Sequence, residues 1–264
     1  MTLNRTWITG GLCLVLLAAA GQLPRVTAEE TKKPSEAADK ASEAKPGEPL
    51  KIGSVRCSRI LYLGNSITLH GPAPQIGWTG NFGMAATSEA NDYVHLLTKR
   101  IATAAKGEPQ IRVRNIADFE RNHDRYDVAT ELKAELAFQP ELVIVAIGEN
   151  VAALKDDAAR DHFRTAVEGL LKTLDGHGHP TIIVRSCFWA DPAKDEALQQ
   201  AAKTVGATFV DIRTLGADPT MAARSEQKIE HDGVAAHPGD KGMKAIAEAI
   251  WKGLEARASA KAAK

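Results

Sequence analysis

The sequence has no excess of either charge and no apolar run long enough to cross a membrane. It contains 33 basic and 33 acidic side chains, and this balance gives no electrostatic reason to expect a nucleic acid partner. The apolar run at residues 11–20 is well short of the roughly 20 residues that a transmembrane helix needs. We therefore expect neither nucleic acid binding nor stable insertion into a membrane.

Residues 1–28 are typical of a secretory signal peptide. Arg5 lies in a short polar start, the apolar run follows, and Val26-Thr27-Ala28 precedes two acidic residues. We expect cleavage after Ala28 and an exported protein, either periplasmic or extracellular. Cys13 is preceded by Gly-Gly-Leu rather than by the small residues expected before a lipid-modified cysteine, so a lipoprotein is not predicted.

The next segment, residues 29–52, is predicted to be a disordered tether. It consists almost wholly of Glu, Lys, Ala, Ser, Pro and Gly, and it cannot bury enough apolar surface to offset its ordering entropy. One folded domain is expected over residues 53–258, followed by a tail at 259–264. Loss of Arg5 and Arg25 with the signal peptide leaves 31 basic and 33 acidic side chains, a formal charge of about −2.

From Arg59 onward, short apolar runs alternate with longer amphipathic segments. Strands rich in β-branched residues are predicted at 60–63, 111–116, 142–147, 181–188 and 208–212. Helical spacing occurs twice, in Tyr93, Leu97 and Ile101 behind the candidate N-cap Ser88, and in Met243, Ile246, Ala247, Ile250 and Leu254 behind Asp240. This alternation predicts an α/β fold, with a parallel sheet between two layers of helices.

Two cysteines remain after removal of the signal peptide. Cys57 precedes the first predicted strand and Cys187 closes the fourth. A parallel sheet places these positions at opposite ends, beyond the reach of a disulfide. We therefore predict two free thiols.

Three candidate chemical groups occur at the carboxyl edge of the predicted sheet, where ligands bind in such folds. Ser66 follows the first strand on a glycine-assisted turn, a position that suits a nucleophile but also a turn-capping serine. Asn150 follows the third strand behind Gly148, and its amide either donates to an oxyanion or forms a turn. His237 stands beside Pro238 just before the last helix.

Together these segments resemble, in order and position, the sequence blocks of the SGNH hydrolases, also called the GDSL family. Gly64-Asn65-Ser66-Ile67 is similar to the nucleophile block, with Asn65 where an aspartate is usual. Gly148-Glu149-Asn150 is similar to the oxyanion block, and His237-Pro238 with Gly242-Met243 to the block of the base. The resemblance, over roughly residues 59–255, implies a three-layer α/β/α flavodoxin-like fold with strand order 2-1-3-4-5. It also implies an esterase, lipase or carbohydrate deacetylase that needs no cofactor.

The resemblance further implies a serine hydrolase mechanism. His237 takes the proton of Ser66 during attack on an acyl carbonyl, and water then hydrolyses the acyl-enzyme. The expected oxyanion donors are the Ser66 backbone N–H, the Asn150 side chain and the N–H of Ala117, which stands where the family has a glycine. The family's orienting carboxylate lies three residues before the histidine, where this chain has valine. We expect Asp232 to take that role, with Glu230 or a backbone carbonyl as alternatives.

The loop at residues 71–84 is long for a connection between a strand and a helix. We expect its Trp78 and Phe82, together with Asn65, to contact the substrate, and the alternative is that the two aromatic rings form a small lid core. His70 either faces the cleft or is structural. The polar residues after the second strand either line the site or are solvated, namely Asp118, Glu120, Arg121 and His123. His177 and His179 are expected away from the cleft, and no metal site is predicted.

The sequence thus predicts an exported serine esterase acting on an acylated carbohydrate or another small ester. Two alternatives stay open. One is a catalytically decayed domain that binds carbohydrate, suggested by the missing aspartate before His237 and the altered first block. The other is a lipid acyl hydrolase, although the sequence offers no long apolar flap for an acyl chain.

Overall fold

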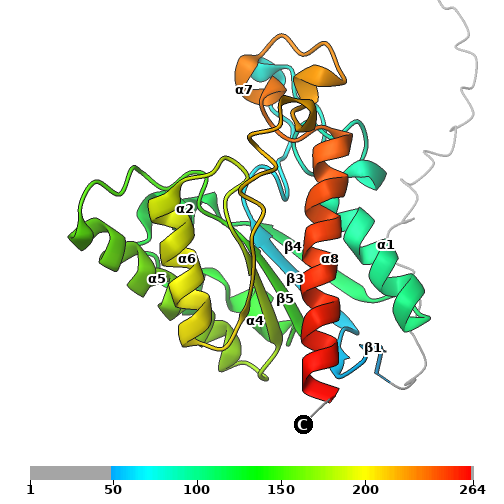
Figure 1. The fold of residues 1–264 in the computed structure, drawn as a ribbon, viewed down its shortest axis with the longest axis vertical. Helices are drawn as coiled ribbons and strands as arrows, with labels where there is room; N and C mark the ends of the chain where they lie inside the picture. Colours follow the sequence, from blue (N-terminus) through cyan, green and yellow to red (C-terminus); the bar gives the residue numbers. More distant parts are fainter. Residues whose placement is uncertain (1–48, 263–264) are drawn as a thin grey trace, which may run out of the picture. The chain divides into compact units, whose positions relative to one another are not determined.

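The computed structural model describes residues 49–262, and it is built around a parallel sheet of five strands (Figure 1). The strands are β3 (Arg59–Gly64), β4 (Gln110–Asn115), β5 (Leu142–Ala146), β6 (Thr181–Arg185) and β7 (Thr208–Val210). Their order is β4-β3-β5-β6-β7. Counted within this sheet alone the order is 2-1-3-4-5, so the predicted α/β topology is confirmed. A separate antiparallel hairpin, β1 (Lys51–Ile52) with β2 (Val55–Arg56), precedes it.

Two hydrophobic cores lie on the two faces of the sheet. All five residues of β5 are buried, and successive residues of a strand alternate between the cores. In β3, Ile60 and Tyr62 belong to one core, whereas Leu61 and Leu63 belong to the other. This period of two explains why the central strands read as unbroken apolar runs in the sequence.

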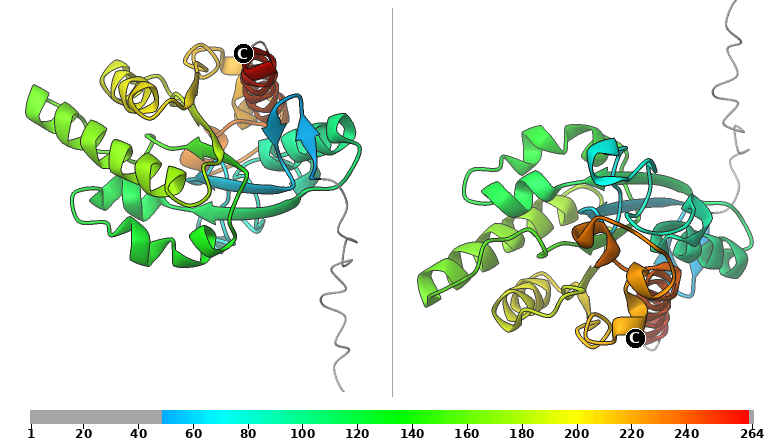
Figure 2. Two further views of the ribbon diagram at one scale, coloured as in Figure 1. Left: turned by 90° about the horizontal axis from the view of Figure 1, so that it is seen from below. Right: turned by 90° about the horizontal axis from the view of Figure 1, so that it is seen from above.

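The helices cover both faces of the sheet, as the views from below and from above show (Figure 2). On one face, α1 (Tyr93–Ala105) packs beside α8 (Asp240–Ala262). The other face is covered by α5 (Asp157–Asp175), α6 (Pro192–Thr204) and three shorter helices, α2 (Ala117–Asn122), α3 (Val128–Glu131) and α4 (Lys133–Ala137). The short helix α7 (Asp232–Ala235) lies at the top of Figure 1. Four 3-10 turns complete the described elements, at Pro74–Ile76, Glu89–Asn91, Pro219–Met221 and Ala223–Ser225.

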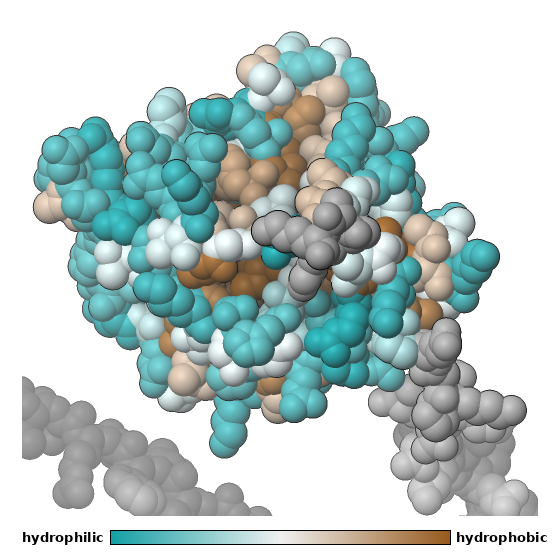
Figure 3. Space-filling model, turned by 60° about the horizontal axis from the view of Figure 1, so that its bottom comes forward, coloured by the Kyte–Doolittle hydropathy of each residue, from teal (hydrophilic) through white to brown (hydrophobic). Residues whose placement is uncertain are grey.

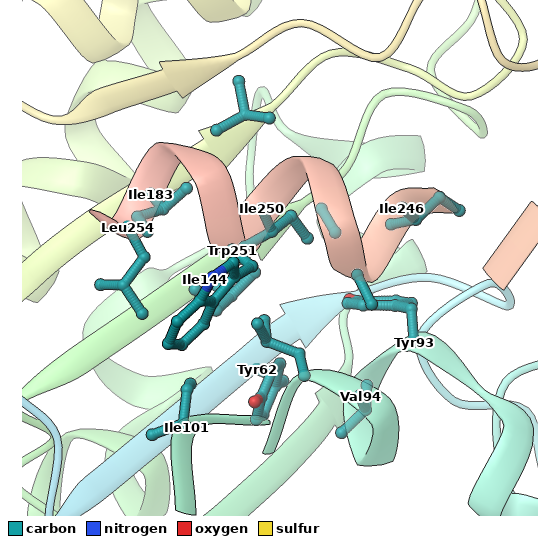
Figure 4. Packing of buried hydrophobic residues seen from close by; sticks show 14 of the residues in the cluster. Tyr62, Tyr93, Val94, Ile101, Ile144, Ile183, Ile246, Ile250, Trp251 and Leu254 are labelled. Atoms are coloured by element: carbon teal, nitrogen blue, oxygen red, sulfur yellow. The ribbon is translucent and has the colours of Figure 1, made fainter. Parts of the chain in front are cut away.

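The predicted apolar stripe of α8 is confirmed. Figure 4 shows Ile246, Ile250 and Leu254 of this helix together with Tyr62 and Ile144 of the sheet. Residues at spacings of three and four share one helical face, and burying a side chain of this size contributes roughly 1.5–3 kcal/mol. Asp240, expected as the helix cap, opens α8, and its carboxylate accepts hydrogen bonds from Thr87 and Asn91.

The prediction that Ser88 caps the first long helix is wrong. Helix α1 is capped by Asp92, whose carboxylate accepts from the His95 N–H at 2.8 Å. Ser88 instead precedes the 3-10 turn Glu89–Asn91. The Asp92 carboxylate also accepts from the Gly83 N–H at 3.1 Å, so the buried cap ties α1 to the loop that follows Ser66.

The folded part extends beyond the predicted boundaries of 53 and 258. Residues 51–52 of the predicted tether pair with Val55–Arg56, and α8 continues through Ala262 into the predicted tail. The predicted signal peptide and the rest of the tether lie outside the described residues. Cys57 and Cys187 are both buried and free, as predicted.

Hydrophilic residues cover most of the face shown in Figure 3, which lies at the end of the molecule opposite α7. Hydrophobic residues gather towards the middle of that face. None of the helices between residues 49 and 262 combines the length and the hydropathy of a membrane-spanning segment.

Candidate active site

The sheet register brings three loops to one point. Gly64 at the end of β3 is level with Asn115 of β4 and with Ala146 of β5. Residues two positions further along each chain, Ser66, Ala117 and Gly148, therefore leave the sheet side by side. Ser66, Ala117, Asn150 and His237 line one cavity of about 570 Å³, so the three segments singled out in the sequence do converge.

The turn that presents Ser66 requires a glycine at position 64, because no space is left there for a side chain. A Cβ at Gly64 would lie 1.9 Å from Thr68 Oγ1 and 2.9 Å from the Ala146 carbonyl oxygen, because residues 65–68 fold back over the end of β3. The Asn65 carbonyl accepts from the N–H groups of Thr68 and Leu69, and its side-chain oxygen accepts from the Ile67 N–H. The turn is thereby fixed, with Ser66 half-exposed at the cavity.

Ser66 and His237 form a hydrogen-bonded pair, with 2.8 Å between Oγ and Nε2. On the other side of the ring, Nδ1 lies 2.7 Å from the carbonyl oxygen of Gly233. A carbonyl only accepts, so Nδ1 carries the proton and donates it there. Nε2 is then unprotonated and accepts from the Ser66 hydroxyl, which is the arrangement a general base requires.

The prediction of Asp232 as the orienting group is wrong. Asp232 is exposed at the start of α7, and the group on His237 Nδ1 is the carbonyl of the next residue, Gly233. Gly233 and His237 are four residues apart, one helical turn, which brings the ring over this carbonyl. The backbone-carbonyl alternative therefore holds. Glu230, the other alternative, is exposed and lines a neighbouring cavity instead.

The surroundings of His237 favour the neutral imidazole. Burial lowers the pKa of His237 from its ordinary value of 6.5, and the hydrogen bond to Gly233 opposes this shift. His70 and His231 nearby also lower the pKa. The base is consequently in its proton-accepting form at neutral pH.

Two of the three predicted oxyanion donors are available. The Ser66 N–H has no hydrogen-bond partner among residues 49–262. The Asn150 side chain lines the cavity, and its amide nitrogen uses one contact, at 2.6 Å, on the Glu120 carboxylate. The prediction for Ala117 is wrong, because its N–H donates to Asn115 Oδ1 at 2.9 Å and is committed to the turn that starts α2.

A buried polar network lies behind the cavity wall, and sequence reasoning did not find it. Glu120 accepts hydrogen bonds from Asn65, Gly148 and Asn150. Glu149 is held by Arg185, with 2.6 Å between carboxylate and guanidinium. The Arg185 and Glu149 side chains are 0% and 3% exposed, so this is an ion pair in the interior of the protein.

The two carboxyl groups of the network differ in their pKa. Burial and the charge of Glu149 raise the pKa of Glu120. The pKa of Glu149 is lowered despite its burial, because Arg185 and the Phe188 N–H stabilise the charged form. Glu149 is thus the site of the negative charge that Arg185 balances.

The prediction that Asn65 binds substrate is wrong, since its side chain is fully buried. Its amide nitrogen donates to Glu120 at 3.0 Å and to Glu149 at 2.6 Å. An aspartate at position 65 would place a third carboxyl group against those of Glu120 and Glu149, and it would supply no hydrogen-bond donor. This contact explains why the first block carries an amide where the resembling family has an acid.

The aromatic residues of the long loop pack as a small lid core, which is the alternative to substrate contact. Both rings also line a cavity of about 1010 Å³ beside the first one, so substrate contact stays a prediction. Trp78 is only 8% exposed and packs with Ala73, Met84, Ala85 and Val234. Its ring lies edge-to-face on Phe82, at 5.1 Å between centroids. An aromatic residue that sequence reasoning missed is Trp189. It follows β6, is 37% exposed, and lies edge-to-face at 5.2 Å from the His237 ring.

The remaining candidates separate into lining and distant residues. His70, Asp118 and Arg121 line the cavity, together with His231 and Arg114. His123 packs on the ring of Phe163 instead, and His177 and His179 are exposed beyond the other end of the sheet. Across the described part of the chain, no cluster of three or more His, Cys, Asp or Glu side chains is placed to hold a metal ion.

The sheet order and the three converging loops are those expected from the sequence resemblance. The fold is thus a parallel sheet between two layers of helices, with the strand order 2-1-3-4-5. No protein-family model and no curated protein matches the chain.

Solved structures similar to this chain include a protein from Parabacteroides merdae described as a GDSL-like lipase. Its TM-score is 0.49 and its identity 16%, and the match covers 76% of this chain and 98% of that one. A family two carbohydrate esterase from Cellvibrio japonicus has a TM-score of 0.44 and 18% identity, with 76% and 61% covered. An acetyl xylan esterase from Butyrivibrio proteoclasticus has a TM-score of 0.47 and 15% identity, with 78% and 65% covered.

Proposed function

We propose that this protein is a serine esterase of the SGNH type that removes an acyl group from a carbohydrate. The observation that carries the proposal is the chain of hydrogen bonds from Ser66 through His237 to the Gly233 carbonyl, at 2.8 and 2.7 Å. The Ser66 end of this chain of hydrogen bonds lies in a cavity at the carboxyl edge of the sheet, where catalytic groups of such folds gather.

The geometry suits acyl transfer in two steps. His237 Nε2 takes the Ser66 proton as Oγ attacks the ester carbonyl, and the negative oxygen is held by the Ser66 N–H and the Asn150 amide. His237 then returns its proton to the leaving alcohol, and the acyl group stays on Ser66. In the second step His237 removes a proton from water, which attacks the acyl-enzyme, and Ser66 recovers its proton as the acid leaves.

Polar lining supports a carbohydrate over a lipid substrate. The cavity lining includes the polar or charged side chains of His70, Arg114, Asp118 and Arg121 beside the apolar Ile76, Met84 and Val234. Its wall is therefore not the continuous apolar one that an acyl chain would require. The exposed ring of Trp189 beside His237 offers a surface for a sugar ring. A second cavity of about 1010 Å³ shares Ile76, His231 and Val234 with the first, which leaves room for the rest of a larger glycan.

Export is part of the proposal and rests on the sequence of residues 1–28. In a host that processes its signal peptides, the mature protein should begin at Glu29. N-terminal sequencing of the protein from the culture fluid or periplasm measures this. An intact Met1 in the cytoplasmic fraction would contradict it.

The enzyme assay compares the wild type with Ser66→Ala on short aryl esters and on acetylated polysaccharides. We expect Ser66→Ala to lower kcat/KM at least about 10³-fold, because both steps pass through the Ser66 oxygen. Ser259→Ala is the matched control, since its hydroxyl only bonds the Glu255 carbonyl within α8. Full activity in Ser66→Ala would refute the assignment.

Two further readouts separate the alternatives. A fluorophosphonate probe should label the wild type and leave Ser66→Ala unlabelled. An unlabelled wild type that still bound acetylated glycans would instead identify a binding domain without catalysis. Faster turnover of long-chain than of acetyl esters would identify a lipid acyl hydrolase.

A further inference from the structure

Glu120 is a buried carboxyl group that the proposed mechanism does not use. It is 0% exposed, so it lies behind the wall of the catalytic cavity and does not reach a substrate. Within residues 49–262 no Lys, Arg or His forms an ion pair with it. Burying a carboxyl group without a cation beside it lowers the stability of the fold. Hydrogen bonds to the carboxyl group must therefore compensate for the lost hydration.

Those contacts all lead to the catalytic loops. Oε1 accepts from Asn65 Nδ2 at 3.0 Å, from the Gly148 N–H at 2.6 Å and from the Asn150 N–H at 3.3 Å. Oε2 accepts from Asn150 Nδ2 at 2.6 Å. One side chain on α2 thus joins the residue before the nucleophile to the turn that carries the oxyanion asparagine.

The Asn150 amide is held at both ends. Its nitrogen donates to Glu120, and its oxygen accepts from Arg121 Nη2 at 3.2 Å. An amide fixed in this way does not turn over, because the reversed amide would oppose its oxygen to Glu120 and its nitrogen to Arg121. The nitrogen has two hydrogens, and with one on Glu120 the other is left for a ligand in the cavity.

We propose that Glu120 is a positioning residue, which fixes the Asn150 side chain so that its second N–H serves as the oxyanion donor. The inference rests on the proposed esterase function and names a further residue for it. Because Glu120 lies behind the wall, its effect on the reaction passes through Asn150 rather than through contact with the substrate.

The test is a double-mutant cycle with Glu120→Gln and Asn150→Ala. A glutamine that keeps one oxygen on Asn65, Gly148 and the Asn150 N–H must turn its own NH₂ towards Asn150 Nδ2. Two donors then face each other, and the amide is displaced. Loss of one oxyanion donor costs about 10²–10³ in kcat, so we expect a fall of about 10²-fold in kcat for each variant, with KM changed less than about threefold.

The double variant distinguishes positioning from independent effects. If Glu120 acts through Asn150, the double variant should be no worse than the poorer single variant, within about threefold. Losses that multiply, to about 10⁴-fold, would overturn the proposal, as would a Glu120→Gln enzyme with wild-type kcat. Rates are given per active site, counted by end-point fluorophosphonate labelling, so misfolded protein does not lower them.

Glu141→Gln is the matched control. Glu141 is also a buried carboxyl group, and it accepts from the Ser58 N–H at 2.8 Å at the other end of the sheet. It should keep kcat within about twofold, which shows that losing a buried carboxylate does not by itself slow the reaction. If Glu120→Gln does not fold, Glu120→Asp replaces it in the same cycle, since the shorter acid cannot reach all four donors.

The failure of this inference differs from failure of the proposed function. If the wild type neither hydrolyses esters through Ser66 nor reacts with the probe, both are overturned. If the wild type is active through Ser66 and the cycle is additive, the esterase assignment stands and the role of Glu120 alone is refuted.

Discussion

Replacing Asp232 by asparagine is expected to leave catalysis almost unchanged. In a serine hydrolase whose histidine is held by a carboxylate, the corresponding acid-to-amide change lowers kcat about 10⁴-fold, or about 5.5 kcal/mol, because the imidazole adopts the wrong tautomer. In this protein the tautomer is set by the Gly233 carbonyl at 2.7 Å from Nδ1. The Asp232 side chain is exposed, and exposed substitutions of this kind usually stay within about 0.5 kcal/mol. That figure corresponds to a factor of about two in rate.

The assay measures kcat and KM for Asp232→Asn, Glu230→Gln and His237→Ala on one aryl acetate. The two acid-to-amide variants should stay within about twofold of the wild type, whereas His237→Ala should lose at least about 10³-fold. All three substitutions lie in one loop, so the conclusion depends on how the three variants rank in kcat/KM. A 10³-fold loss in Asp232→Asn with unchanged folding would refute the assignment of Gly233 as the orienting group.

Three further predictions concern the base, the buried network and the exposed ring. Burial lowers the pKa of His237 below 6.5, and only the neutral base is active. We therefore expect kcat/KM to be constant at neutral pH and to fall as the pH drops below 6.5. An acid limb centred above pH 7 would contradict this. Asn65→Asp removes the donor to Glu120 and Glu149 and buries another acid. This should lower the free energy of unfolding by about 3–5 kcal/mol and the Tm by about 10 °C, at 2–4 °C per kcal/mol. An unchanged melting curve would show that the network accommodates a third acid. Trp189→Ala should raise KM about tenfold for acetylated glycans, since ring stacking contributes about 0.5–1.5 kcal/mol, and should change KM for aryl acetates less than about twofold. Equal effects on both substrates would indicate that Trp189 holds His237 instead.

The fold could be predicted from the sequence because the inner strands β3, β5 and β6 are buried on both faces. Runs such as 142–147 are apolar at every position, and Gly64 at the end of β3 and Gly148 after β5 mark where the chain leaves the sheet. A Cβ at Gly148 would lie 2.4 Å from Cys187 Sγ, so that glycine is required by packing as well as by its φ of +127°. The predicted ends of β6 and β7 were too late, because the buried residues Cys187, Phe188 and Ile212 lie beyond the last paired positions of the sheet.

The candidate site was predictable only where a residue lies directly after a strand or directly before a helix. Ser66, Asn150 and His237 each sit next to a recognisable turn, and the sheet brings them together. The orienting group of His237 is a backbone carbonyl, which every residue possesses and no pattern marks. Trp189 also follows a strand at the same edge, and that position was the signal that would have found it.

Glu120 was named among the polar residues after the second strand, but its role depends on contacts that no local pattern contains. Its partners come from residues 65, 148 and 150, on loops that meet only after the sheet has formed. In the sequence it resembles its exposed neighbours Asp118 and Arg121. The helical period separates them, since α2 turns Phe119 and Glu120 inward while Asp118 and Arg121 face the cavity.

The site therefore places its carboxylates behind the oxyanion donor rather than beside the base. The ring of His237 is oriented by a carbonyl, which stabilises the transient imidazolium less than a charged carboxylate would. The donor side is correspondingly well fixed, with Asn150 held between Glu120 and Arg121. It follows that Glu120→Gln should slow the reaction far more than Asp232→Asn, the reverse of the order expected where an acid supports the base. Measuring both variants side by side tests whether the buried carboxylate behind Asn150, rather than the acid in the loop of His237, supports the proposed reaction.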